Sequence, residues 1–383
     1  MSPANIVKVG PANPQTQSLL MQLPRELRNY IYASLFSSTR FTSGERHDVD
    51  SVIFRFIPAP HGLALLLSCR RAYIEIGKSW VSQVLFCFES GRGMVDKLGD
   101  IPLETRSMIR HIRVSADLLA IGYDDRYVQY DTHQALKLLP GLKLDRLTVC
   151  SITPPETSYD ILSRLVEHSD GWKELCYKSH ASDFLGYKPD RHSEERGLFL
   201  REPQPGGWQR KLEGRDGSES GASVTIYQSN VSYMRDFDED LRFLEEFEPH
   251  VSNTGTWVKF TQALAPNQDI KDYQKVADRR LMVYGEIGKE MLVVVKRGRG
   301  VDYEEKEGSP YIKAGDIRAA FPGKTWGEIK ACDDRIEDII CQGISHHRED
   351  SDWDEEYMDV MDVYTHVDDY VFPPLPEFRW MIG

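Results

Sequence analysis

The sequence has no long apolar run. Its longest ones, Leu63 to Leu67 and Met291 to Val295, fall far short of the roughly 20 residues that span a bilayer. The stretch before Leu23 contains no basic segment followed by an apolar core, which is the pattern of a secretory signal. We therefore expect no association with a membrane and a location in the cytoplasm or the nucleus.

The motifs that mark metal and catalytic sites are also missing. The six cysteines include no pair at the spacing of a zinc site, so we expect reduced, buried thiols rather than ligands. Neither Gly-x-Ser-x-Gly nor His-Glu-x-x-His occurs, and the glycines of GRDGSESG lack the lysine of a phosphate loop. The sequence therefore indicates no catalytic residue, no metal site and no cofactor.

Positive charge is scarce relative to negative charge. The chain carries 47 Lys and Arg against 60 Asp and Glu, a formal net charge of −13. Such an excess of negative charge disfavours sequence-independent binding to nucleic-acid phosphates or to anionic lipids. We therefore do not expect nucleic acid as a partner.

Apolar side chains are abundant enough for compact cores, at 40% of the 383 residues with 10% aromatic. A chain of this length fits two compact domains with tails. The first ordered segment is predicted near Leu19, after a leader that contains three prolines.

Two amphipathic helices are predicted near the N-terminus. The segment LPRELRNYIYASLF begins at Leu23, with Pro24 at a position suited to a helix start and apolar residues spaced three or four apart, at Leu27, Tyr30, Ile31 and Leu35. A second helix is predicted over 63–80, where Leu66 lies in the apolar stripe. Between them we expect a polar loop over 37–48 and a short strand or extended arm over 52–57. Helices this short are marginal alone, so their apolar faces should pack together or on a partner.

Strands and helices alternate in the centre of the chain. Buried strands are predicted over 84–89, 109–115, 144–150 and 173–179, with helices over 132–139 and 158–169. Connections of this length suit crossovers, so we expect a small parallel sheet. Leu147 and Leu175 lie 28 residues apart in the similar segments LDRLTV and WKELCY. This spacing leaves two alternatives open: a leucine-rich repeat or an ordinary α/β layer.

The rest of the sequence is more irregular. Gly, Pro and charged residues between 186 and 221 predict a loop or hinge. Strands are predicted over 223–229 and as a pair within 279–298, and helices over 239–247, 312–321 and 325–340. The acidic stretch after His347 reads as a solvated tail, with Trp353, Tyr357, Met358 and Val360 leaving room for a short binding motif.

The two N-terminal helices together resemble the F-box-like start of a large group of filamentous-fungal proteins. The matches are Leu23, Pro24, Glu26, Leu27, Arg28, Asn29, Ile31 and Tyr32, followed by Cys69, Arg70 and Tyr73. Later phrases such as GWKELCYKSH and GASVTIYQSN are similar to members of the same group, to about residue 330. One departure is the 45-residue separation of Pro24 and Cys69, which is wider than a compact F-box.

The resemblance implies that the first module docks on a Skp-type adaptor, which links a protein client to a cullin ubiquitin ligase. The implied interface residues are Leu23, Pro24, Leu27, Ile31 and Leu66, acting as apolar anchors. The alternative is that these residues form the protein's own core.

The expected fold is mixed α+β and α/β. The expected parts are a disordered leader (1–17), an F-box-like helical module (18–90), a small mainly parallel α/β layer (91–185), a loop or hinge (186–222), a second α+β region (223–345) and an acidic tail (346–383). The α/β layer is either leucine-repeat-like or ordinary. The leading hypothesis is a non-catalytic protein-interaction module, acting as a substrate receptor of a ubiquitin ligase. The first alternative is an enzyme or small-ligand binder with a site between the two α/β regions, and the second is a scaffold that acts through the acidic tail.

Overall fold

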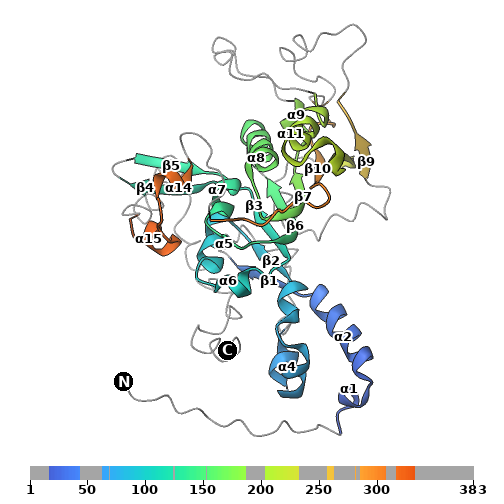
Figure 1. Cartoon of the computed structure of the whole chain (residues 1–383). Coiled ribbons are helices and arrows are strands. Elements are labelled where there is room, and N and C mark those ends of the chain that lie inside the picture. The colour runs from blue at the N-terminus through green and yellow to red at the C-terminus, as the bar shows by residue number, and fades with distance from the viewer. Residues whose placement is uncertain are drawn as a thin grey trace, which may run out of the picture.

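The computed structural model describes residues 17–43, 63–68, 70–123, 126–151, 153–186, 203–232, 257–262, 281, 285–307 and 316–332. Within these residues the fold is mixed α and β and is built on one large, mostly parallel sheet (Figure 1). None of the helices in these ranges has the length and apolar character needed to cross a membrane.

Eight strands of the described chain form this sheet, in the order β1-β2-β3-β6-β7-β10-β8-β9. The first five are parallel and follow one another in chain order, whereas β10, β8 and β9 are added antiparallel. Their bounds are β1 (Arg40–Ser43), β2 (Leu85–Phe88), β3 (His111–Ser115), β6 (Leu144–Ser151), β7 (Trp172–Ser179), β8 (Ser223–Ser232), β9 (Trp257–Phe260) and β10 (Lys289–Lys296). A separate hairpin pairs β4 (Leu119–Tyr123) with β5 (Arg126–Tyr130).

Helices form a continuous layer beside the sheet. Helix α15 contacts α5, α5 contacts α7, α7 contacts α8, and α8 contacts α11. The bounds are α5 (Gly91–Leu98), α6 (Leu103–Arg106), α7 (Thr132–Lys137), α8 (Pro155–His168), α9 (Asp183–Gly186), α11 (Gly206–Asp216), η2 (Ser218–Ser220), α14 (Ile317–Ala320) and α15 (Trp326–Ala331). Right-handed crossovers between parallel strands in sequential order place their helices on one face, as this layer shows.

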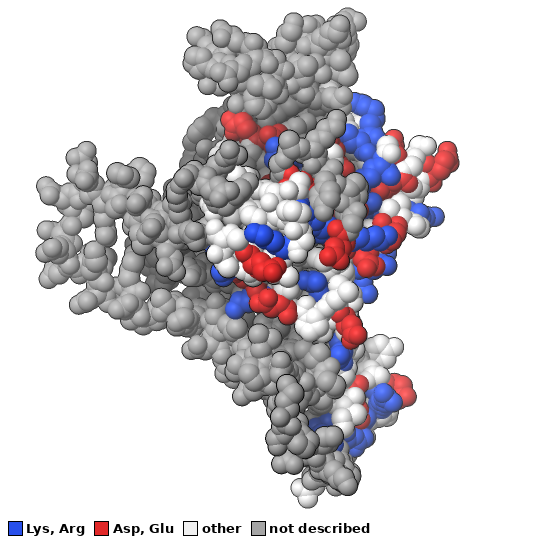
Figure 2. All heavy atoms as spheres, turned by 60° about the vertical axis from the view of Figure 1, so that its left-hand side comes forward, with Lys and Arg blue, Asp and Glu red and all other residues white. Residues whose placement is uncertain are grey.

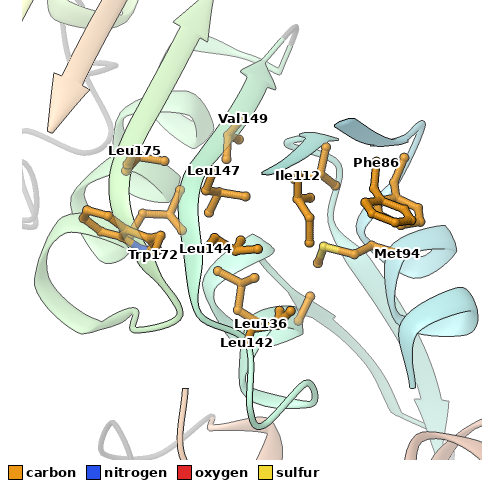
Figure 3. Close-up of a cluster of buried hydrophobic side chains, with 14 of the residues drawn as sticks. Phe86, Met94, Ile112, Leu136, Leu142, Leu144, Leu147, Val149, Trp172 and Leu175 are labelled. Carbon is orange, nitrogen blue, oxygen red and sulfur yellow. The ribbon is translucent and has the colours of Figure 1, made fainter. Parts of the chain in front are cut away.

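The core lies between that layer and one face of the sheet. Side chains alternate across a strand, so every second residue faces the helices. Ile112, Leu147 and Leu175 lie in direct register on the successive strands β3, β6 and β7. Leu147 and Leu175, which occur in similar sequence segments, are therefore neighbours in the sheet. Figure 3 shows these residues with Met94 of α5 and Leu136 of α7 in one apolar cluster. The spacing between registered residues is not constant, because the stretch from Ile112 to Leu147 also contains the β4–β5 hairpin.

The N-terminal helices stand beside the first strands. They are α1 (Leu19–Gln22), α2 (Arg25–Ser37), α3 (Ala64–Ser68), α4 (Arg70–Ile76) and the 3-10 turn η1 (Ser79–Ser82). In Figure 1, α2 and α4 lie side by side and project from the sheet next to β1 and β2. The segment predicted as a helical module therefore also contributes two strands to the sheet.

After β10 the chain returns along the end of the sheet where the parallel strands begin. We call residues 297–307 and 316–332 the return segment. The amide of Gly171 donates to the Tyr303 carbonyl at 2.5 Å, and the amide of Gly141 donates to the Glu305 carbonyl at 2.7 Å. Farther on, α14 contacts α7 and α15 contacts α5. The return segment thus crosses the starts of β7 and β6 and ends beside α5.

A buried arginine fixes the start of the return segment. The Arg297 guanidinium binds both carboxylate oxygens of Asp216 at 2.8 to 3.0 Å and reaches Asp170 at 3.2 Å. It also lies 5.5 Å from the ring centroid of Trp172, which is a cation–π contact. These contacts join β10, α11 and the start of β7.

Two predictions about local structure were wrong, and one element was missed. The polar loop over 37–48 contains β1, which pairs with β2 because Phe41 packs on Phe86 and Trp80, with ring centroids 5.8 and 5.9 Å apart. The loop or hinge over 186–222 contains α11, whose Trp208 is fully buried and donates to Ser163 Oγ at 3.0 Å. The β4–β5 hairpin was not predicted.

The strands β3, β6 and β7 confirm the predicted parallel arrangement. The strands predicted after residue 222, β8 and the second of the 279–298 pair, extend the same sheet. The predictions for 1–16, 52–57, 239–247 and the acidic tail fall outside the described residues.

Candidate functional site

Helix α2 presents two faces of different kind. Arg28, Tyr32 and Phe36 recur every four residues and are buried. The apolar residues of another side are exposed: Leu27 by 49%, Tyr30 by 75%, Ile31 by 42% and Leu35 by 36%. We call these four residues the α2 surface. The helix therefore turns an apolar stripe away from the protein, although burial of such a stripe is the usual outcome.

The buried face of α2 is held by Arg28. Its Nε donates to Glu75 Oε2 at 2.8 Å and a terminal nitrogen donates to Glu75 Oε1 at 2.6 Å, so the guanidinium grips the α4 carboxylate with two parallel hydrogen bonds. It also donates to the carbonyl oxygens of Leu23 and Met21, which lie at the turn before α2. Bidentate arginine–carboxylate pairs fix orientation as well as adding energy. Arg28 thus sets the rotation of α2 that leaves its apolar stripe outward.

The charges of this pair reinforce one another. Hydrogen bonding from Arg28 holds the pKa of the Glu75 carboxyl below its usual range, with further help from Arg71 Nε at 3.1 Å. The same hydrogen bond raises the pKa of Arg28. Burial raises the pKa of Tyr32, whose hydroxyl lies 3.4 Å from Glu75. All three groups keep their ordinary protonation states at neutral pH.

The residues predicted as an interface separate into two groups. Leu27 and Ile31 lie on the α2 surface, with Pro24 exposed at the N-cap and Leu23 half-buried before it. Leu66 is only 5% exposed and belongs to the apolar core. Leu66 does not share the surface of the other residues, because its side of α3 faces inward. Tyr30 and Leu35 complete the surface, and their spacing along the helix was the signal for both.

Two further exposed apolar residues lie on the N-terminal helices. Leu19 of α1 is 81% exposed and Ile74 of α4 is 60% exposed. With the α2 surface, they make up six of the eight large apolar residues that the described chain exposes most. Exposed apolar surface gathered in one part of a protein marks interaction sites.

The sheet face opposite the helices carries cysteines but no sign of an active thiol. Cys87 and Cys150 lie on this face near Arg113, whose charge is coupled to both thiols. Burial raises the pKa of Cys87 to about 11, so it stays protonated at neutral pH. The thiolate is the reactive form, so Cys87 is not a reactive thiol at neutral pH.

A polar cluster at α7 has a structural explanation. Asp131 caps α7 by accepting hydrogen bonds from the amides of His133 and Gln134 at 3.1 and 3.4 Å. Its other carboxylate oxygen accepts from Arg164 at 2.9 Å. Capping and pairing account for the burial of this acid. In the described part of the chain, His, Cys, Asp and Glu side chains form no group of three or more that could hold a metal ion.

Comparisons with protein-family models, curated protein sequences and solved structures found no match to this chain. The geometry of the α2 surface is therefore the strongest guide to a function.

Proposed function

We propose that the chain is a non-catalytic, F-box-like interaction protein whose α2 surface binds a Skp-type adaptor in the cytoplasm or nucleus. The observation that carries this proposal is the outward apolar stripe of Leu27, Tyr30, Ile31 and Leu35. An amphipathic helix in an apolar groove uses anchors with this i, i+3, i+4 spacing. Each anchor contributes of order 1 to 3 kcal/mol when a partner removes it from water.

The rigidity of the module supports the same role. Arg28 and Glu75 fix α2 against α4, and Tyr32 and Phe36 are buried. A surface held in its binding geometry loses less conformational entropy on association.

The sheet supplies the other half of the proposal. Five parallel strands in chain order with helices on one side are the arrangement of leucine-repeat-like layers, although the spacing of the units varies. We propose that this body carries a protein client, which the adaptor brings to a ubiquitin-charged enzyme. The mechanism is proximity and orientation rather than bond chemistry. On the face that Figure 2 shows, the acidic and basic side chains of the described residues are interspersed, whereas a nucleic-acid-binding face carries clustered basic side chains.

The direct test is calorimetry of the purified full-length chain with a purified Skp-type adaptor. We expect binding that the double variant Leu27→Asp with Ile31→Asp weakens at least tenfold, about 1.4 kcal/mol. The matched control is Ala33→Asp, which places the same side chain at an exposed position on another side of α2. No binding by the folded chain, or equal weakening by Ala33→Asp, contradicts the proposal.

A further inference from the structure

A serine lies within the apolar stripe of helix α2. Ser34 follows Tyr30 by four positions and Ile31 by three, and its side chain is exposed. It also follows Leu27 by seven positions. Residues at these separations share one side of an α-helix, which turns once in about 3.6 residues. Ser34 is therefore a polar member of the stripe that the α2 surface forms.

The position of Ser34 in the stripe is central rather than marginal. Successive residues are about 100° apart around an α-helix, so Tyr30 lies about 40° to one side of Ser34. Leu27 and Ile31 lie about 20° and 60° to its other side. A partner that covers these three apolar side chains therefore covers the serine as well.

The Ser34 hydroxyl makes no hydrogen bond to the part of the chain that the structure describes. The next two serines along the chain differ from it in this respect. Ser37 Oγ donates to the Ser34 carbonyl oxygen at 3.1 Å, and Ser38 Oγ donates to the Leu35 carbonyl oxygen at 2.9 Å. Their hydroxyls bind carbonyls at the end of α2, whereas the Ser34 hydroxyl is available to a partner.

Covering this hydroxyl has a free-energy cost that the apolar residues around it do not have. Burial of apolar side chains favours binding, whereas a hydroxyl that leaves water without a new hydrogen bond opposes it. A partner groove that is apolar throughout therefore loses affinity at Ser34. A groove with one hydrogen-bonding group at this place avoids the loss. The serine thus discriminates between grooves that are otherwise similarly apolar.

We propose that Ser34 is the specificity-determining residue of the α2 surface, and that it selects an apolar groove with one polar side chain that hydrogen-bonds to its hydroxyl. A serine hydroxyl both donates and accepts, so a side-chain amide or a hydroxyl of the partner fits this place. The role of Ser34 rests on the proposed function, because the adaptor is the partner that covers the α2 surface.

The test is calorimetry of the full-length chain with the purified Skp-type adaptor, for the native sequence and for Ser34→Ala. Alanine is the stronger helix former, so α2 is retained, and circular dichroism checks the fold of each variant. We expect Ser34→Ala to weaken binding about tenfold, because the polar group of the adaptor is left buried and unpaired. The matched control is Asn29→Ala, which removes an exposed polar side chain about 140° away around α2 and should leave the affinity unchanged.

The opposite result distinguishes the two kinds of groove. In a groove that is apolar throughout, Ser34→Ala removes the cost of covering the hydroxyl and tightens binding. Unchanged or tighter binding by Ser34→Ala therefore overturns the role of Ser34 and leaves the proposed function in place. Equal weakening by Asn29→Ala also overturns this role, whereas no binding by the folded native chain overturns the role and the proposed function together.

Discussion

Lys137 of α7 and Asp316 of α14 form an ion pair with 2.7 Å between Nζ and Oδ2, and both side chains are almost fully shielded from solvent. The second Asp316 oxygen accepts from the Arg318 amide at 2.8 Å and caps α14. Gln134 adds a third link by accepting from the Ile317 amide at 3.0 Å. A salt bridge between residues 179 positions apart thus closes the return segment onto the helical layer.

Lys137→Met should destabilise the fold by roughly 3 to 5 kcal/mol, because Asp316 keeps a buried charge without its cation. The double variant Lys137→Met with Asp316→Asn should recover much of this loss, since it removes the charge and retains a capping side chain. Urea unfolding followed by circular dichroism measures both. A double variant no more stable than Lys137→Met would show that the cost is not electrostatic.

Gly141→Ala should cost more stability than Gly285→Ala. Both glycines have a positive φ, +87° and +92°, which costs an alanine roughly 1 to 2 kcal/mol. At Gly141 the new methyl group would also displace the exposed end of the Leu103 side chain, which adds a small further cost, whereas at Gly285 it meets open space. The midpoints of thermal unfolding of the two variants make the comparison, and equal midpoints would contradict the steric argument.

Glu75→Gln should loosen α2 at neutral pH but not in acid. The folded pKa of Glu75 is lowered, so its contribution to stability is present above the ordinary glutamate pKa and is lost as the pH falls through the lowered value. Hydrogen exchange of the α2 amides in the variant should be faster than in the native chain at pH 7, and the difference should shrink as the pH falls below the ordinary glutamate pKa and through the lowered one. Glu26→Gln, at an exposed position in the first turn of α2, is the control.

Leu66→Ala should lower the free energy of unfolding much more than Leu27→Ala does. Truncation of a buried leucine costs about 2 to 5 kcal/mol, whereas truncation of a half-exposed one costs much less. Chemical denaturation of the two variants measures the difference. Equal, small losses would mean that Leu66 does not belong to the core.

The strongest local patterns predicted their elements well. The strands at 144–150 and 173–179 and the helix between them were predicted because apolar residues recur at one clear period in each. The two similar segments around Leu147 and Leu175 lie on neighbouring strands with these leucines in register, which their spacing alone did not predict. The predicted strands and helix depend on short stretches of sequence alone.

Other features depend on partners far away in the chain. The short strand β1 carries little strand signal, and its pairing with β2 begins only at Leu85. The amphipathic pattern of α2 identified Leu27 and Ile31 as members of one stripe, but not whether that stripe is buried. Its direction is set by Arg28 and Glu75, two charged residues 47 positions apart.

The position of β10 has a consequence for synthesis of the protein. Its partner β7 ends at Ser179, and β10 begins only at Lys289. At roughly 5 to 20 residues per second, the ribosome needs on the order of 10 s to make the stretch between them. During this interval the β7 edge has no strand from β10 to pair with, and an unpaired strand edge is a template for aggregation. The β7 edge of the nascent chain is therefore open to aggregation until β10 has been made.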